Sequence, residues 1–228
     1  MRAGLCALLF ATTVWAQPPS TPGPTRGAVI FEGARLLRPG SGPPIQRGTL
    51  LVENGRIVRI GETAGDVKAP AGATRIDLAG KTVMPLLVDT HVHLGYQKGL
   101  VFAVDNFTRD TIVDQLDRYL YAGVGAVLSL GTDPGALPFQ LRADQAAGRR
   151  GGSIWLTAGR GIAAPNAGPG TPELKASAYG VTTEEEARRA VREQTANKVD
   201  FIKIWVDDRE GRMKTLPPDL YRVIIEEA

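Results

Sequence analysis

Short runs of alternating apolar and polar residues fill the chain from residue 28 to residue 82. Such alternation is typical of strands, and it predicts four of them, at 28–31, 49–53, 56–60 and 74–78. Asn54 and Gly55 stand between the second and third strands, and both residues accept the positive φ of a type I′ turn. This part of the chain is therefore expected to form a small β-domain that contains a hairpin.

Beyond Thr82 the pattern changes to apolar strands that alternate with helical stretches. Strands are predicted at 83–93, 126–130, 154–157 and 201–206, and helices at 109–122, 137–147, 184–197 and 219–228. Thr182 and Glu185 are spaced as a capping box for the third helix. Alternating strands and helices favour βα units on a parallel sheet, so the fold class is α/β.

The N-terminus has the pattern of an export signal. Residues 1–16 carry one arginine, an apolar stretch and small residues before Gln17, which indicates a cleaved signal peptide, and residues 17–27 form a Pro-rich linker. A buried N-terminal helix is the alternative, although the prolines continue it poorly. We expect a secreted or periplasmic protein without membrane attachment after cleavage. Cys6 lies in the signal, so the mature chain has no disulfide.

Composition and charge exclude other classes of protein. The 228 residues are 43% hydrophobic and 22% charged, as in ordinary globular proteins. The 27 basic residues nearly balance 24 acidic ones, so the net charge is only +3 and no basic cluster forms. Binding to nucleic acid is therefore not expected. The sequence leaves the oligomeric state open, including a homo-oligomer.

Two histidines, His91 and His93, are the only ones in the chain. Residues two apart in a strand share a face, so Asp89, His91 and His93 are predicted to point together. Two parallel imidazoles on a rigid strand suit adjacent positions on Zn²⁺ or a similar cation, with Asp89 as a supporting group. The alternative is a pair of ordinary half-buried histidines.

Lys203 lies in the fourth predicted strand of this part. Alternation places Ile202 and Ile204 on one face, which suits a helix-covered surface, and Lys203 and Trp205 on the other. A lone ammonium among apolar groups is costly unless it is paired, deprotonated or modified. A deprotonated lysine can add carbon dioxide and become an anionic carbamate that bridges two cations. A lysine that reaches solvent at the strand end is the alternative.

These motifs resemble those of a known family. AGKTVMP at 79–85 and VDTHVHL at 88–94 are similar to the first barrel strand of the metal-dependent amidohydrolase superfamily, whose pattern is GKxVxPGxxDxHxH. DFIKIW at 200–205 resembles the fourth strand of its imidazolonepropionase-like and prolidase-like branch, and NGRIVRIG at 54–61 its small β-sandwich. The resemblance covers residues 28–228. Leu86 departs from the pattern, where glycine is usual.

The resemblance implies a fold and a site. Residues 28–82 would be part of a β-sandwich and residues 83–228 the first four βα units of a TIM-like (β/α)8 barrel. His91 and His93 would bind the first metal, and Lys203 would be the carbamylated bridge between one or two divalent ions, most commonly zinc. The family takes two more histidines and a catalytic aspartate from later strands, and this sequence has no third histidine. We therefore expect the N-terminal half of a longer enzyme, truncated and inactive alone.

The implied activity is hydrolysis of amide or other non-ester C–N bonds by metal-bound hydroxide, with small molecules or dipeptides such as Xaa-Pro as substrates. Loops after the strands build the pocket of such barrels, which makes the loops at 95–97, 132–133 and 160–178 candidates. Among their residues, Tyr96 and Arg160 are predicted to bind substrate, Arg160 through a carboxylate. A surface role for Arg160 is an alternative. A non-catalytic secreted binding module, a degenerate remnant and a structural metal protein are the rival functions.

Overall fold

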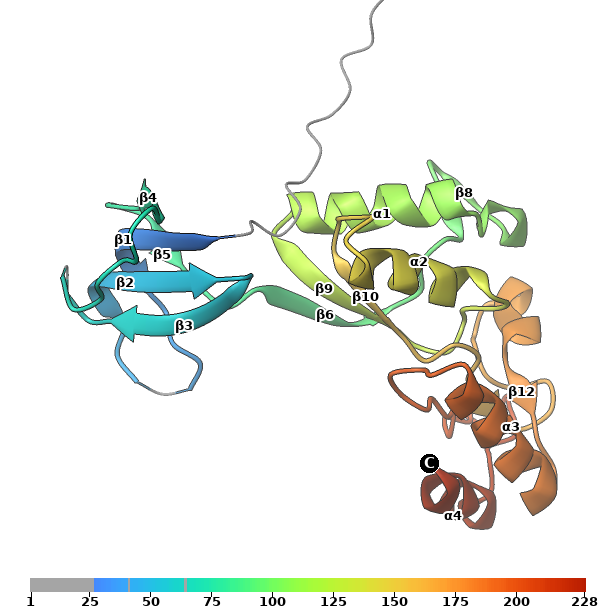
Figure 1. Cartoon of the computed structure of the whole chain (residues 1–228). Coiled ribbons are helices and arrows are strands. Elements are labelled where there is room, and N and C mark those ends of the chain that lie inside the picture. Colours follow the sequence, from blue (N-terminus) through green and yellow to red (C-terminus); the bar gives the residue numbers. More distant parts are fainter. Residues whose placement is uncertain (1–26, 41, 64) are drawn as a thin grey trace, which may run out of the picture.

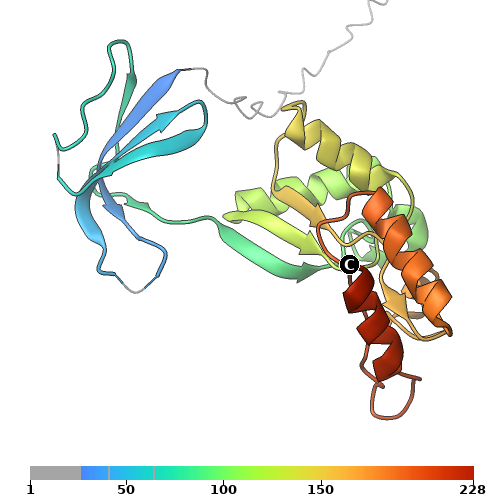
Figure 2. The ribbon, with the colours of Figure 1, turned by 60° about the horizontal axis from the view of Figure 1, so that its bottom comes forward.

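The computed structural model describes residues 27–40, 42–63 and 65–228. These residues form a mixed α/β structure, with a five-stranded sheet first and a three-stranded parallel sheet with helices after it. Figures 1 and 2 show the first sheet set apart from the rest and joined to it by extended chain. The predicted signal peptide and all but the last residue of the predicted linker lie outside the described residues.

The first sheet confirms the four predicted strands and adds a fifth. β1 pairs with β2 antiparallel and with β4 and β5 parallel, while β3 pairs with β2. Asn54 and Gly55 form the predicted turn, with φ of 51° and 77°. The strands are β1 (Ala28–Leu36), β2 (Ile45–Glu53), β3 (Arg56–Gly61), β4 (Thr74–Asp77) and β5 (Thr82–Val83).

This sheet buries apolar side chains on both faces. Adjacent residues Leu50 and Leu51 enter different clusters because side chains alternate along a strand, Leu50 with Leu36 and Leu51 with Ile30 and Val67. A sandwich needs two packed sheets. The described residues of this part supply a single sheet, so the assignment of residues 28–82 to part of a β-sandwich stays a prediction.

The second part is a parallel sheet in the order β10-β9-β6. The strand predicted at 83–93 is divided, because β5 pairs with β1 of the first sheet and β6 begins four residues later. Apart from the strand predicted at 201–206, the other boundaries agree with the predictions to within two residues. The elements are β6 (Leu87–Val92), α1 (Arg109–Tyr121), β9 (Val124–Ser129), α2 (Leu137–Ala146), β10 (Ile154–Thr157), α3 (Glu184–Ala196) and α4 (Pro218–Glu227).

Short elements that were not predicted connect these strands and helices. The capping box of α3 is also shifted by one residue from the prediction, since Thr183 and Glu186 form it. None of the helices in the described part of the chain is long and apolar enough to cross a membrane. The short elements are β7 (Gln97–Lys98), β8 (Val101–Phe102), η1 (Val104–Asn106), β11 (Ile162–Ala163), η2 (Pro172–Ser177) and β12 (Tyr179–Gly180).

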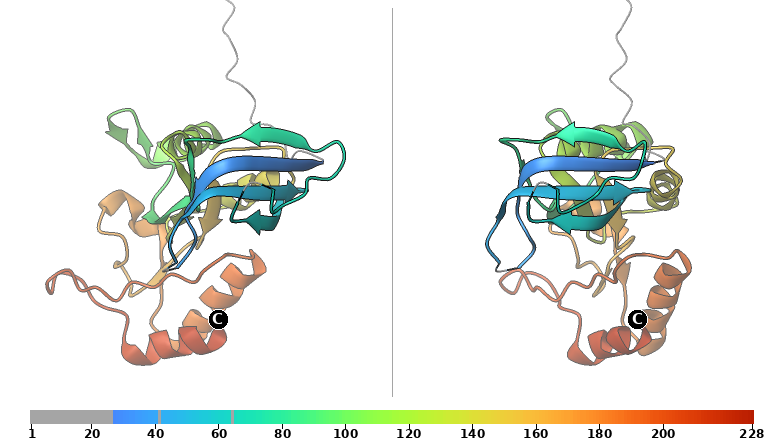
Figure 3. Two further views of the ribbon diagram at one scale, coloured as in Figure 1. Left: turned by 90° about the vertical axis from the view of Figure 1, so that its left-hand side faces the viewer. Right: turned by 60° about the vertical axis from the view of Figure 1, so that its left-hand side comes forward.

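Two apolar cores hold the helices in place. α1 and α2 pack on the parallel sheet around the buried side chains of Leu116, Val127 and Trp155. α3 and α4 pack together around Val191 and Ile224, and Figure 3 shows this helix pair below the two sheets. α1 and α2 therefore cover one face of the parallel sheet, and α3 and α4 form a separate packed pair.

The fourth predicted strand, at 201–206, does not form a regular strand. One parallel bridge joins Ile204 to Ile162, with Ile162 N donating to Lys203 O at 2.8 Å and Trp205 N to Ile162 O at 3.0 Å. Ile202 and Ile204 still pack against the α3–α4 core, as their alternation predicted. The segment is extended and lies beside β11, but its pairing ends after one residue, so no ladder develops.

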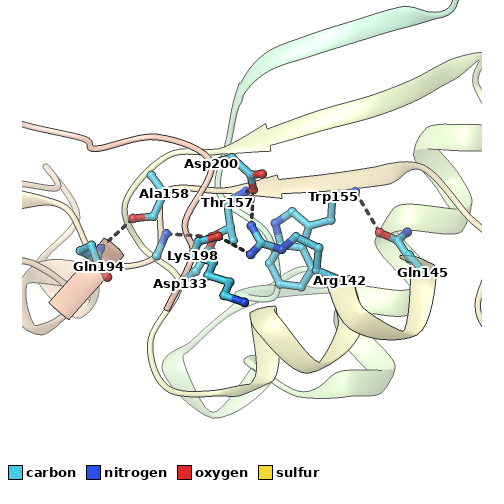
Figure 4. Close-up of polar contacts among 10 residues, drawn as sticks. Asp133, Arg142, Gln145, Trp155, Thr157, Ala158, Gln194, Lys198 and Asp200 are labelled. Carbon is cyan, nitrogen blue, oxygen red and sulfur yellow. Dashed lines mark hydrogen bonds and ion pairs between the residues drawn. The ribbon is translucent and has the colours of Figure 1, made fainter. Parts of the chain in front are cut away.

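Asp200 anchors the start of this segment (Figure 4). Its carboxylate accepts the N–H of Thr157 at 2.9 Å and pairs with Arg142 of α2 at 2.5 Å. Its own N–H donates to Thr157 O at 2.9 Å. The end of β10, helix α2 and the chain that leads to Lys203 are thereby held together.

Candidate metal centre

The structure brings the three predicted metal ligands into one pocket. His91 lies in β6, His93 follows its last residue, and Lys203 reaches the same space from the segment beside β11; all three line a pocket of about 310 Å³. The two imidazole centroids are 5.3 Å apart, with their planes at 79°. Residues far apart in the sequence thus meet where the resemblance implies a metal.

The strand that carries the histidines is irregular. Val92 is buried in the core beneath α1, so His91 and His93 point away from it. The ladder to β9 shifts register between Asp89 and Val92. Because one residue is inserted there, Asp89 faces α1, where it adds to the effect of burial in raising the pKa of Tyr119. The prediction that Asp89 shares the histidines' face is wrong.

A buried threonine orients His93. Nδ1 of His93 lies 2.9 Å from Oγ1 of Thr132, whose side chain is fully buried. The hydroxyl of Tyr96 donates to the carbonyl of Thr132 and fixes that residue in turn. With Nδ1 engaged, Nε2 is the nitrogen that remains for a metal, the usual arrangement of a ligating histidine and its supporting group.

Burial lowers the pKa of two bases in this pocket, His93 and Lys203. It lowers the pKa of His93 to about 4, with the charges of His91 and Lys203 acting in the same direction. It also lowers the pKa of Lys203, whose Nζ lies 5.4 Å from the centre of the Trp205 ring. A neutral imidazole can ligate a cation and a neutral amine can add carbon dioxide, so both groups are disposed toward the chemistry that the resemblance implies.

Two glycines let the lysine segment approach β9 and β11. A Cβ on Gly131 would lie 2.8 Å from Cγ of Lys203, and one on Gly161 only 2.1 Å from Cζ3 of Trp205. Any larger residue would displace Lys203 or Trp205 from the pocket. Both glycines follow predicted strands, at 126–130 and 154–157, and this position is the sequence signal for their role.

Tyr96 lies in the core and not in the pocket wall. Its side chain is 1% exposed and packs on Phe102 and Phe107, at centroid distances of 5.8 and 5.1 Å. Burial raises the pKa of its hydroxyl well above the ordinary value for tyrosine. The predicted substrate contact is corrected to a structural one, because the hydroxyl is used on Thr132.

Arg160 lies outside the histidine pocket as well. Its guanidinium stacks 3.9 Å from the centre of the Tyr179 ring and donates to the carbonyls of Ser177 and Ala178, both at 3.1 Å. These contacts hold the loop between β11 and β12. The prediction that Arg160 binds a substrate carboxylate has no support in this position.

Asp133 is a buried carboxyl in the predicted loop at 132–133. It is 1% exposed, and the hydroxyls of Ser129 and Thr157 donate to it at 2.6 and 2.5 Å. Burial raises its pKa to about 6, against the effect of these hydrogen bonds. The residue ties the C-terminal ends of β9 and β10 together behind Thr132 and does not line the histidine pocket.

The ligand set in the described residues fits part of a metal site. No group of three or more His, Cys, Asp or Glu side chains gathers in residues 27–40, 42–63 and 65–228. Two imidazoles and one amine do converge, and zinc takes three or four protein ligands. The residues present therefore suit one side of a metal centre and need further donors to complete it.

Comparison with known proteins gives matches among solved structures only. No family model matches the sequence, and a search of curated proteins finds no match. A protein named as a prolidase from Bifidobacterium longum is 27% identical with a TM-score of 0.71, over 91% of this chain and 47% of that one. A prolidase in complex with N-methylphosphonate-L-proline is 21% identical with a TM-score of 0.69, over 88% of this chain and 53% of that one.

A Xaa-Pro dipeptidase with bound methionine in its active site is 22% identical with a TM-score of 0.68, over 88% of this chain and 54% of that one. The chain thus spans about half the length of the solved structures it matches. Its fold is thus similar to about half of solved structures that are named as prolidases and amidohydrolases.

Proposed function

We propose that this chain is the N-terminal portion of an exported metal-dependent hydrolase that cleaves amide or other non-ester C–N bonds, with dipeptides such as Xaa-Pro among its substrates. The observation that carries the proposal is the convergence of His91, His93 and Lys203 in one pocket. The similar structures support the reaction class, since they include proteins named as a Xaa-Pro dipeptidase, molinate hydrolase and phenylurea hydrolase B.

The same proposal includes a (β/α)8 barrel that continues beyond the described strands. β6, β9 and β10 are parallel, and the segment that leads to Lys203 begins beside the end of β10, where Asp200 N donates to Thr157 O. Leu86, Leu87 and Val88, before and at the start of β6, are 52%, 50% and 47% exposed. Further strands of a barrel would cover such apolar side chains.

Each residue has a defined part in this proposal. His91 and His93 would hold a divalent cation, with zinc the first choice, and Lys203 would join them as a carbamate. A cation held there would supply Lewis acidity for amide hydrolysis. The hydroxyl of Thr132 contacts Nδ1 of His93, and the ring of Trp205 lies beside Nζ of Lys203.

The first test is made on the complete gene product, after the coding frame beyond the codon for Ala228 has been read. We expect stoichiometric divalent metal and hydrolysis of a panel of Xaa-Pro dipeptides, N-acyl amino acids and ureas. A purified protein without metal at any stage, and without hydrolysis after zinc, cobalt or manganese is added in bicarbonate buffer, would contradict the proposal.

Export is tested separately from catalysis. N-terminal sequencing of the native protein should begin at Gln17 if residues 1–16 are removed, as a signal peptidase would do. A mature protein that retains Met1 would remove export from the proposal and leave the reaction unaffected.

A further inference from the structure

One arginine lies in the same pocket as the metal ligands and has no part in the proposed chemistry. Arg209 lines the pocket with His91, His93 and Lys203, and it is the only arginine among the residues that line it. Its side chain is 40% exposed, so a ligand can contact it while the loop keeps its conformation.

The backbone holds Arg209 in an uncommon conformation. Arg209 and Glu210 have φ of 51° and 60°, which residues with a side chain rarely adopt, and Gly211 follows at 78°. The carboxylates of Asp207 and Asp208 accept the N–H groups of Arg209 and Glu210, at 2.8 and 3.0 Å. Two strained residues in succession, held by local carboxylates, are typical of a loop that must present a side chain in one place.

An ion pair lies at one edge of the guanidinium. Its Nε is 2.7 Å from Oδ2 of Asp207, although the contact does not have hydrogen-bond geometry. Its Nη1 lies so close to Gly170 that a Cβ there would be 2.5 Å away, so this glycine provides the space for the group. Within the described residues no hydrogen-bond acceptor is found for Nη1 or Nη2, and this edge of the fork is available to a ligand.

The other walls of the pocket define what such a ligand looks like. Leu174, Trp205 and Val206 are apolar residues that line the same pocket as the guanidinium and the metal ligands. A volume of about 310 Å³ suits a compact molecule. A planar arginine fork matches a carboxylate with two parallel hydrogen bonds. The pocket therefore fits a small substrate that has an apolar part and carries a carboxylate.

We propose that Arg209 binds a free carboxylate of the substrate and thereby selects anionic substrates over neutral ones. This inference rests on the proposed function, since it places the scissile bond at His91, His93 and Lys203 and the carboxylate at the loop of residues 207–211. It also assigns to Arg209 the part that the sequence had given to Arg160.

The test compares matched substrates on the complete, metal-loaded protein. Each Xaa-Pro dipeptide is paired with its C-terminal amide, and kcat and KM are measured for the wild type, Arg209→Gln and Arg209→Lys. We expect the wild type to prefer the acid, and Arg209→Gln to raise KM for the acid roughly 10- to 100-fold while the amide changes little. Arg209→Lys should restore part of the preference.

Arg212→Gln is the matched control. Arg212 lies in the same loop, is 74% exposed and pairs with Glu210 at 2.9 Å, but it does not line the histidine pocket. It should leave the ratio of acid to amide unchanged. Equal losses on both substrates in Arg209→Gln, or a wild type that does not distinguish acid from amide, would overturn the inference while the hydrolase proposal stands.

A direct binding measurement separates the two proposals if no hydrolysis is seen. Isothermal titration with L-proline and L-prolinamide reports carboxylate binding without turnover. Binding of L-proline that Arg209→Gln abolishes would support the inference even though the proposed reaction had failed. L-Proline that binds neither protein in the millimolar range would overturn it.

Discussion

The two sheets differ in where they bury polar side chains. In the first sheet Thr49 is fully buried, and its hydroxyl has no partner within the described residues. In the parallel sheet, Ser129, Thr132, Asp133 and Thr157 are all buried at the C-terminal ends of β9 and β10, and each is hydrogen-bonded.

The paired polar cluster belongs to the part that holds the histidines. Burying a polar group costs free energy unless it is hydrogen-bonded, and all four residues of the cluster are hydrogen-bonded. The cluster lies directly behind His93. The first sheet has apolar clusters and surface ion pairs such as that of Arg75 with Glu32, and it contributes support to the fold.

Removing a proposed metal ligand gives the largest expected effect. His91→Ala in the complete protein should abolish stoichiometric metal binding and lower kcat/KM by several orders of magnitude, because an imidazole of the metal site is lost. Metal content by mass spectrometry and steady-state kinetics measure both. Arg75→Ala in the first sheet is the matched control, and it should change neither, since an exposed ion pair contributes little. Full metal content in His91→Ala would refute the assignment.

Asp133 should make the parallel sheet sensitive to pH. Its pKa of about 6 in the folded protein exceeds the ordinary value of 3.8, so the folded state binds more protons between these pH values. The protonated carboxyl therefore stabilises the folded state below about pH 4. The free energy of unfolding falls by about 3 kcal/mol as pH rises from about 4 to 6. Urea unfolding between pH 4 and 7 should show this fall, and Asp133→Asn should remove it.

An acidic residue on the surface gives the opposite sign. Hydrogen bonds from Arg109 and Arg149 hold the pKa of Asp144 below its ordinary value, so its contribution is lost as pH falls. Asp144→Asn should therefore weaken the protein at neutral pH and leave the fall between pH 4 and 6 in place. If Asp133→Asn retains the wild-type dependence on pH, another group is responsible.

The sequence predicted local structure in both parts well. The hairpin at Asn54 and Gly55 and the helices of the second part depend on residues close together in the chain, so turn chemistry and periodicity are sufficient. The convergence of His91, His93 and Lys203 was also predicted, because the resemblance assigned all three residues to one metal site.

What the sequence missed depends on contacts between distant segments. The inserted residue in β6 turned Asp89 toward α1, and a period of two cannot show a bulge. The contacts of Tyr96 with Thr132 and of Arg160 with the 176–178 carbonyls are made across the fold. Lys203 lies in a segment that forms a single β-bridge, although the alternation of its residues predicts a full strand at 201–206.

Variants of Thr132 test the contact that orients His93 without removing His93 itself. Thr132→Val removes the hydroxyl that holds Nδ1 of His93, and metal affinity should fall roughly 10- to 100-fold. Thr132→Ser should restore it, and Tyr96→Phe should give a smaller loss. Competition with a chelating dye measures the affinity, and the visible spectrum of the Co²⁺ form reports the ligand geometry.

Thr49→Val is the corresponding change in the first sheet. It removes a hydroxyl of equal burial and should leave metal affinity unchanged. An equal loss of affinity in both variants would mean that buried threonines act through general stability, and the role assigned to Thr132 would be withdrawn.

The smallest expected effect is confined to the hairpin of the first sheet. Gly55 has φ of 77°, and a Cβ there would meet nothing within 4 Å, so Gly55→Ala imposes only the conformational cost of a left-handed residue. This cost is about 1 kcal/mol, to be measured as a shift of the urea midpoint. Metal content and kcat/KM should stay at wild-type values, because the turn lies in the part that holds no ligand. A loss of metal in Gly55→Ala would show that the two sheets are energetically coupled, and the division of support from function between them would then be wrong.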